Sequence, residues 1–329
     1  MRFALTPEQR QFAASLDDLL GAADVPAAAR CWVSGEHGPV RDIWRRLGEL
    51  GATALAVPER YDGLDAHPVD LVVAFEAFGR HALPGPLVES LAVLPILLDE
   101  HSAAARWLPD LAAGKRIATV ALPPHVPYAL DAGAADVVFE HRDGSLRLVE
   151  GPGEALRSVD PARSPHLVGA GASLGQVDAA RAWEFGVLTC TAQLLGAGLA
   201  MLETTREYAA GRRQFGRPIG AFQAVKHQLA DVLVGLELAR PLLYGAAVAL
   251  ADGAGTAGRD TSAAKIATGV AAHRAARAAL QVHGALGYTQ EYDLSLWLTK
   301  VRALKSAWGT DAVHRARVMD YLATESMSS

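Results

Sequence analysis

The 329-residue sequence is half hydrophobic and one fifth charged, which is the balance of a globular protein that can bury a substantial core. Its 31 basic and 36 acidic residues give a formal net charge of −5, which argues against binding to nucleic acid or to an anionic membrane. Cys31 and Cys190 lie far apart, and no cysteine or histidine spacing predicts a metal site.

The N-terminus lacks the basic start and apolar run of a secretion signal, so we expect a reduced, cytoplasmic setting. The most apolar windows are interrupted by charged residues and proline, and no membrane span is expected.

The first third of the chain is predicted to be helical. Thr6 can cap a helix that has Pro7 at its first position and Gln9 three residues after the cap. We expect further helices over residues 43–50, 70–79 and 87–98. A short extended link is expected over residues 54–58. Together these elements would form an N-terminal α-helical domain over residues 1–113.

From residue 114 the chain becomes rich in glycine, proline and valine. Short strands are predicted over residues 117–122, 136–141 and 146–149, and Asp143-Gly144 is a hairpin signal between the last two. These strands would form a small β domain over residues 114–176.

The segment Gly171-Ala172-Ser173-Leu174-Gly175 fits the pattern around the nucleophile of serine hydrolases. That site requires a strand before the serine, a helix after it, and an aspartate and then a histidine further along the chain. Because Ser164-Pro165 precedes the segment and strands do not alternate with helices, we interpret it as a glycine-rich link into the next domain.

Residues 177–329 are predicted to form a helical bundle. Four apolar residues at steps of four, three and four mark one buried stripe, namely Val225, Leu229, Val232 and Leu236. An alanine-rich helix is expected over residues 263–282, with Gly284 after it, followed by helices over residues 294–305 and 311–322. The predicted fold class is therefore mainly α with a small β insert.

A basic turn between two predicted helices, within residues 206–223, is the first block that indicates chemistry. Two arginines beside exposed backbone amides can hold a pyrophosphate, and Phe215 offers a face for an adenine. Gln223 can both donate and accept at a nucleotide edge. A helix–turn–helix hinge with solvated arginines explains the same residues, so this block alone leaves both interpretations open.

A glycine-rich helix end is the second block, and it reads Gln281-Val282-His283-Gly284-Ala285-Leu286-Gly287-Tyr288-Thr289-Gln290-Glu291. Glycine lets the backbone approach another group closely. A glycine that ends a helix is the simpler interpretation of this stretch taken alone.

Together the two blocks resemble two motifs of the acyl-CoA dehydrogenase family, in the same order: Arg-x-Gln/Thr-Phe-Gly…Gln and Gln-x-x-Gly-Gly-x-Gly-Tyr/Phe-x-x-Glu. Residues 5–9 resemble the family's N-terminal start, and residues 47–51 with 57–63 resemble its Leu-Gly…Pro-Glu-x-Tyr-Gly-Gly segment. The resemblance implies an acyl-CoA dehydrogenase-like fold: an N-terminal helical domain, a middle β domain that is reduced here, and a C-terminal four-helix bundle.

The resemblance also implies FAD as the cofactor, bound across a subunit interface. The first motif would contact the adenine and pyrophosphate part through Arg212, Gln214, Phe215, Ile219 and Gln223. The second motif would line the opposite side of a site shared between chains, through Gln281, Val282, His283, Gly284 and Ala285. Ala285 replaces the second glycine of the family's pair and adds a methyl group there.

In this family a glutamate removes the α-proton of an acyl thioester while the β-hydrogen leaves as hydride to the flavin. Counting from Gly287 without gaps places Trp308 at the usual glutamate position, and tryptophan cannot take a proton. The family's alternative position, on the first long bundle helix, falls near Gly186. Glu184 is a weak candidate base, because residues two apart do not share a helix face.

The family's flavin-ring loop, Ala-x-Thr-Glu-Pro-x-x-Gly-Ser-Asp, is replaced by Thr119–His125, and its later flavin loop is not recognisable. The chain thus resembles the short subunit of actinobacterial heteromeric acyl-CoA dehydrogenases, which act on steroid side-chain CoA thioesters. The resemblance implies an α2β2 assembly in which a second subunit supplies the glutamate. It also implies an acyl-CoA substrate and an electron-transfer flavoprotein or similar acceptor.

Two other functions fit the sequence. One is a catalytically silent structural partner that binds no flavin. The other is a self-sufficient homo-oligomer that uses Glu184 as its base.

Overall fold

The computed structural model, which describes residues 4–289 and 291–328, begins with a helix whose start is set by a capping box. Gln9 donates its backbone N–H to Thr6 Oγ1 at 3.2 Å, and Thr6 donates its own to Gln9 Oε1 at 3.0 Å. Helix α1 therefore begins at Pro7, as predicted from the sequence, and it spans Pro7–Gly21. The helical segments that follow are α2 (Val25–Val33), α3 (Gly38–Glu49), the 3₁₀ turn η1 (Glu59–Tyr61), α4 (Pro68–Arg80), the π-helical η2 (Glu89–Val93), α5 (Leu94–Leu98) and α6 (Ala104–Ala112).

The N-terminal third differs from the sequence prediction in several places, and helix α3 begins at Gly38 rather than at residue 43. Helices α2 and α6 were not predicted, because each is short and alanine-rich and is held mainly by packing on its neighbours. Residues 54–58 form turns rather than an extended link, since the backbone N–H of Ala54 and that of Val57 bond to carbonyls three residues earlier. The helix expected over residues 87–98 contains the π-helical segment η2.

The middle region contains a four-stranded sheet in the order β1-β3-β4-β6, with β1 and β3 parallel and the other neighbours antiparallel. Its strands are β1 (Ala118–Ala121), β3 (Val137–Arg142), β4 (Ser145–Val149) and β6 (Gly171–Gln176), and a separate pair is formed by β2 (Ala129–Leu130) and β5 (Pro165–His166). The predicted hairpin at Asp143-Gly144 is present, and the positive φ of both residues, 52° and 77°, suits the turn that joins β3 to β4.

The Gly171–Gly175 segment is not the glycine-rich link that the sequence indicated. It lies in β6, an edge strand that pairs with β4, and Ser145 and Ser173 share a hydrogen bond between their hydroxyl groups at 3.1 Å. Gly171 is required here, because a Cβ atom would lie 2.5 Å from the Leu148 carbonyl oxygen. The serine is therefore part of a strand and not of a nucleophile turn.

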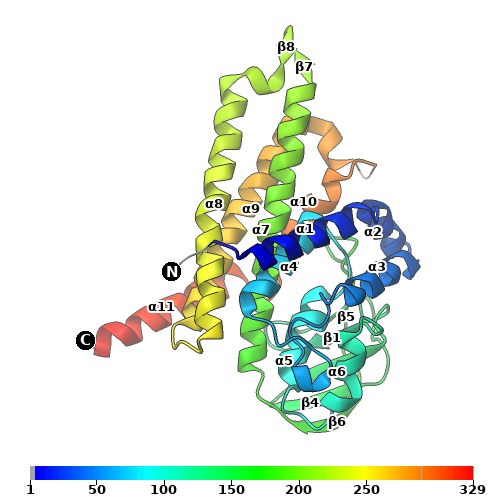
Figure 1. The fold of residues 1–329 in the computed structure, drawn as a ribbon. Coiled ribbons are helices and arrows are strands. Elements are labelled where there is room, and N and C mark those ends of the chain that lie inside the picture. The colour runs from blue at the N-terminus through cyan, green and yellow to red at the C-terminus, as the bar shows by residue number, and fades with distance from the viewer. Residues whose placement is uncertain (1–3, 290, 329) are drawn as a thin grey trace.

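The C-terminal half is a helical bundle, as predicted (Figure 1). It comprises α7 (Ala180–Gly211), α8 (Gln223–Ala251), α9 (Ala257–His283), α10 (Leu294–Ser306) and α11 (Asp311–Ser328), with the hairpin β7 (Arg213–Gln214) and β8 (Arg217–Pro218), the 3₁₀ turn η3 (Ile219–Ala221) and the 3₁₀ turn η4 (Gly284–Tyr288). In the predicted stripe of α8, Val232 and Leu236 are buried, while Val225 and Leu229 nearer the hairpin are half-buried.

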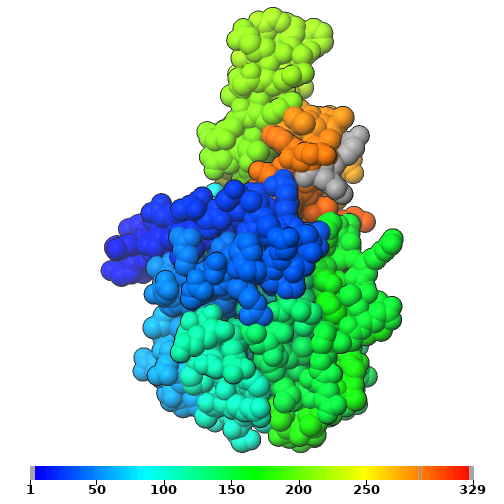
Figure 2. Space-filling model, turned by 90° about the vertical axis from the view of Figure 1, so that its right-hand side faces the viewer, coloured from blue at the N-terminus to red at the C-terminus, as the bar shows by residue number. Residues whose placement is uncertain are grey.

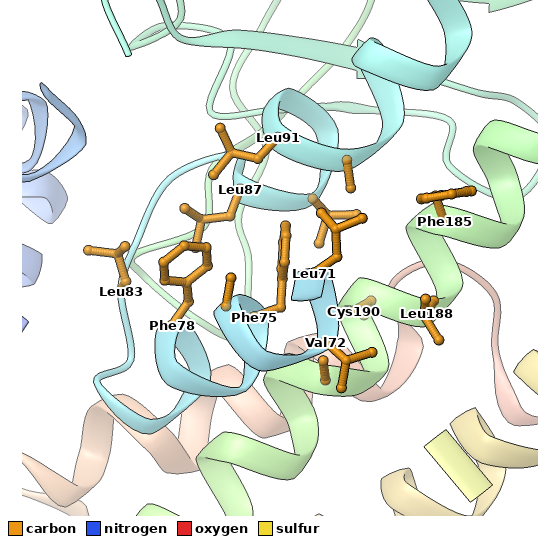
Figure 3. Close-up of a cluster of buried hydrophobic side chains, with 14 of the residues drawn as sticks. Leu71, Val72, Phe75, Phe78, Leu83, Leu87, Leu91, Phe185, Leu188 and Cys190 are labelled. Atoms are coloured by element: carbon orange, nitrogen blue, oxygen red, sulfur yellow. The ribbon is translucent and has the colours of Figure 1, made fainter. Parts of the chain in front are cut away.

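The core is continuous between the N-terminal helices and the bundle. Figure 3 shows Leu71, Phe75 and Phe78 of α4 packed between Leu87 and Leu91 on one side and α7 on the other. Two glycines permit this contact, because a Cβ atom on Gly79 would lie 2.2 Å from Gln193 O and one on Gly196 would lie 1.9 Å from Glu76 O. Helices α4 and α7 therefore touch backbone to backbone.

Helices α7 and α8 are long and apolar enough to cross a membrane by length and composition, which inspection of the sequence did not indicate. The core helix of a soluble protein passes the same test. In α7, 89% of the most apolar window is buried inside the fold, and in α8 the share is 44%. Packing against α4 and α9 accounts for the apolar character of α7.

Candidate functional site

The basic turn of the first motif is a β-hairpin at the tips of α7 and α8, where it forms the far end of the molecule (Figure 1). Figure 2 shows this end standing clear of the body. Phe215 and Gly216 make the turn with φ of 51° and 78°, and the Phe215 side chain is 90% exposed. A bulky residue at positive φ is strained, and such strain is found preferentially at functional sites.

Stacked groups hold the base of this hairpin. The Arg217 guanidinium lies 4.1 Å from the centre of the Phe222 ring, and the rings of Phe215 and Phe222 meet edge to face at 6.2 Å. Arg213 donates to the Gly216 carbonyl at 3.2 Å. The hairpin thus presents a fixed aromatic face surrounded by positive charge.

A cavity of about 370 Å³ lies between the hairpin and the C-terminal end of α9. Its lining residues are Gln214, Phe215, Ile219, Phe222, Ala224, Val225, Gln228, Gln281 and Val282. Gln228 Nε2 donates to Gln281 Oε1 at 3.0 Å and so connects α8 to α9 across the cavity. The sequence led us to expect the second motif on the opposite side of a site shared between chains, whereas the structure brings both motifs to one cavity of one chain.

The remaining predicted residues do not line this cavity. Arg212, Gln223, Gly284 and Ala285 are exposed near it. Gly284 has φ of 63°, so a glycine is favoured where α9 ends. Ala285 is exposed, which accommodates the methyl group that replaces the family's second glycine.

His283 is buried below the helix end. Its ring stacks on Tyr208 of α7 at 4.1 Å, and Nδ1 lies 2.8 Å from the Ala279 carbonyl oxygen. Burial lowers the pKa of His283, so the ring is neutral and Nδ1 donates to that carbonyl. His283 thus supports the end of α9 from within rather than facing the cavity.

Sequence reasoning did not assign Phe222, Ala224, Val225 and Gln228 to the site. Phe222 is the N-cap of α8, and Val225 and Gln228 follow at steps of three on its first turns, next to the hairpin. The cavity offers aromatic and apolar faces, three side-chain amides and nearby arginines. Such a set fits an adenine nucleotide.

Trp308 lies in the body, between α10 and α11, and is 2% exposed. Its indole covers Gly186, where a Cβ atom would lie 2.3 Å from the ring. The two positions at which the sequence comparison expected a family glutamate are therefore in contact with each other. Neither carries a group that can take a proton.

Hydrogen bonds fix the Trp308 segment. The indole Nε1 donates to Glu89 Oε1 of η2 at 3.2 Å, and His314 Nε2 lies 2.9 Å from the Trp308 carbonyl oxygen. The Lys265 ammonium donates to the Leu304 and Ala307 carbonyls at 2.7 and 2.9 Å, which satisfies the C-terminal end of α10. The indole is thus a fixed part of the core.

Glu184, the weak candidate base, makes structural contacts with two other helices of the bundle. One carboxylate oxygen forms an ion pair with Arg317 of α11, and the other accepts the Thr261 hydroxyl of α9 at 2.6 Å. The side chain is 15% exposed. Both oxygens are engaged in joining α7, α9 and α11.

The chain matches the family described as acyl-CoA dehydrogenase, N-terminal domain, over residues 6–115, and that described as acyl-CoA dehydrogenase, C-terminal domain, over residues 178–323. Acyl-CoA dehydrogenase IpdE2 of Mycobacterium tuberculosis is 31% identical over 297 residues, which cover 89% of this chain and 91% of the relative.

Solved structures share the fold over nearly the whole chain. A chain of the ChsE4-ChsE5 complex from Mycobacterium tuberculosis has a TM-score of 0.83 at 24% identity, and covers 98% of this chain and 99% of that one. A variant of the Tcur3481-Tcur3483 steroid ACAD has a TM-score of 0.85 at 24% identity, with the same coverage. The shared fold therefore includes the small β region between the two family matches.

Proposed function

Because this chain belongs to the acyl-CoA dehydrogenase family, a family of oxidoreductases, we propose that it is one subunit of a hetero-oligomeric, FAD-dependent enzyme that dehydrogenates an acyl-CoA thioester. In this proposal the chain holds the adenine and pyrophosphate part of FAD. A second acyl-CoA dehydrogenase subunit supplies the flavin-ring loops and the catalytic glutamate.

The observation on which this proposal depends is a contrast between the hairpin end of the molecule and its body. The hairpin cavity is open and of nucleotide size, whereas the two base positions in the body are occupied by Trp308 and Gly186. A chain built in this way can hold a dinucleotide but has no proton acceptor at those two positions.

Four of the cavity residues, and Arg212 outside the cavity, have roles in this proposal. Phe215 and Ile219 provide faces against which an adenine packs, and Gln214 and Gln281 provide amides for its edge. Arg212, at the exposed end of α7, provides charge for the pyrophosphate. When bound, FAD would accept the hydride from the β-carbon of the thioester.

Two observations support a partner chain. The hairpin stands clear of this chain's own body, so the rest of a bound flavin would extend toward another subunit (Figure 2). The likeness to a chain of the ChsE4-ChsE5 complex supports a second, different subunit, and we propose the α2β2 arrangement that the sequence resemblance implies. The likeness to a steroid ACAD supports a steroid-derived acyl-CoA as the substrate. An electron-transfer flavoprotein or similar acceptor and a cytoplasmic setting are further parts of the proposal, and they rest on the sequence resemblance alone.

Expression of the chain alone and together with candidate partner subunits tests the proposal by the flavin absorbance spectrum and by turnover of a CoA thioester. We expect flavin and turnover only on co-expression. In the complex, Phe215→Ala combined with Gln281→Ala should lower FAD affinity by about tenfold or more, since stacking and amide contacts are lost.

Gln11→Ala, an exposed change on α1, is the matched control and should retain flavin. Yellow, active protein from the chain alone would instead indicate a self-sufficient homo-oligomer. Unchanged flavin content in the Phe215 and Gln281 double variant would indicate a silent structural subunit.

A further inference from the structure

A second cavity, of about 350 Å³, lies where the β region meets the C-terminal end of α10. It shares no lining residue with the hairpin cavity. Its walls are mostly apolar and include Val126, Tyr128, Leu130, Ala307 and Trp308. Its polar groups are concentrated in a few side chains, and two of these are buried.

Arg163 is the first of these buried groups. The residue is 9% exposed and lines the cavity, yet its guanidinium forms no hydrogen bond or ion pair within residues 4–289 and 291–328. Arginine stays charged inside proteins, and the Arg163 side chain borders the cavity, so an anionic acceptor placed there would pair with it. The exposed Arg157 lines the same cavity and adds a second positive charge.

Glu89 is the second buried group. Its Oε1 accepts the Trp308 indole N–H at 3.2 Å, while Oε2 is buried and has no partner among the described residues. Burial raises the pKa of Glu89 and the charge of Arg163 opposes the shift.

The other buried charges nearby do not satisfy Arg163. Asp160 lies 3.7 Å from the Lys300 ammonium, and burial raises the pKa of Asp131 to about 7. Within the described part of the chain, neither aspartate nor Glu89 lies within ion-pair distance of the Arg163 guanidinium. The guanidinium and the Glu89 carboxyl therefore face the same space without meeting.

From this geometry we propose that the cavity binds a compact organic monocarboxylate, whose carboxylate pairs with Arg163 and whose apolar body packs against Trp308. A carboxylate supplies charged acceptors to the Arg163 guanidinium. A neutral acyl thioester would leave the guanidinium without a charged acceptor. This site is independent of the proposed FAD contacts.

Isothermal titration calorimetry of the full chain, within its complex where it is co-purified, tests the site with hexanoate as the probe and hexanamide as its neutral analogue. We expect one saturable hexanoate site per chain and binding of hexanamide at least about tenfold weaker. Arg163→Met should lower hexanoate affinity by about tenfold or more. Arg302→Met, an exposed arginine of α10 that does not line the cavity, should bind hexanoate normally.

Ser306→Phe provides a second test that retains both charges. Ser306 lines the cavity from α10, so a phenyl ring there should fill the space and weaken hexanoate binding even if Arg163→Met folds poorly. Equal affinity for hexanoate and hexanamide, normal binding by a folded Arg163→Met variant, or no saturable binding would each overturn the proposal. Flavin content, measured on the same samples, separates such a result from failure of the proposed function.

Discussion

Trp308 and Gly186 pack directly against each other, so a change at one position affects the other. The indole occupies the space that a side chain at position 186 would need, and the Trp308 backbone holds a φ of 56° to place it there. A hydrogen bond from the indole N–H to Glu89 holds the side chain, and one between His314 and the Trp308 carbonyl oxygen holds the backbone. A glutamate at position 308 would have to be accommodated by a different arrangement of the whole segment.

Gly186→Ala should therefore destabilise the chain by about 1–3 kcal/mol, because the added methyl group overlaps the indole. Without that overlap, alanine in a helix interior is favoured over glycine by about 1 kcal/mol. In a Trp308→Ala background the same change should cost much less. Urea unfolding of the four variants of this cycle measures the coupling, and additive effects would contradict the contact.

Glu184 has a structural role, because its carboxylate joins three helices of the bundle. Glu184→Gln should lower the free energy of unfolding by about 1–2 kcal/mol, since the pair with Arg317 is only partly shielded from solvent. Turnover by the co-expressed complex should change less than about twofold. Glu203→Gln, an exposed partner of Arg206, is the control for stability. A loss of several orders of magnitude in kcat would show that Glu184 is the base.

Among the contacts between elements, the contact between α4 and α7 is the least able to accommodate an added side-chain atom. Gly196→Ala should destabilise the chain by about 3 kcal/mol or more, because the new Cβ would lie 1.9 Å from Glu76 O and both groups belong to packed helices. Gly235→Ala on α8 is the matched control, since its Cβ would meet Ala271 at an ordinary 3.7 Å. Thermal unfolding of both variants should show opposite shifts, and equal shifts would contradict the explanation.

The features that the sequence predicted correctly depend on interactions between residues that are close together in the chain. The capping box at Thr6, the Asp143-Gly144 hairpin and the helix end at Gly284 depend on near neighbours, and the structure has all three. The FAD roles given to residues 212–223 and 281–285 remain predictions, although several of these residues now line one cavity.

The remainder of the candidate sites could not be predicted because their residues are distant in sequence. The indole bond between Trp308 and Glu89 joins positions 219 residues apart, and the Glu184 ion pair joins positions 133 apart. Glu89 also lies in a π-helical segment, for which the sequence carries no distinct signal. Helices α2 and α6 were missed for a similar reason, since packing rather than propensity holds them.

For the whole molecule, the outer face of α8 is the feature that implies association. Val234, Leu238 and Leu242 recur every four residues along this helix and are 56%, 67% and 47% exposed. A row of exposed apolar residues on one helix face is a common feature of protein interfaces. The same helix begins at the hairpin, so a partner that covers its outer face would also lie beside the proposed nucleotide cavity.

Leu238→Asp should therefore separate the chain from its partner subunit, because a charge would be buried without a counter-ion at the centre of that row. The variant should fold normally, since the side chain contributes little to the chain's own core. Analytical ultracentrifugation measures assembly and circular dichroism measures folding, with Leu64→Asp, an exposed leucine of the N-terminal region, as the control. If FAD binding depends on both subunits, the separated variant should also lose its flavin. An intact complex carrying the aspartate would place the interface elsewhere on the bundle.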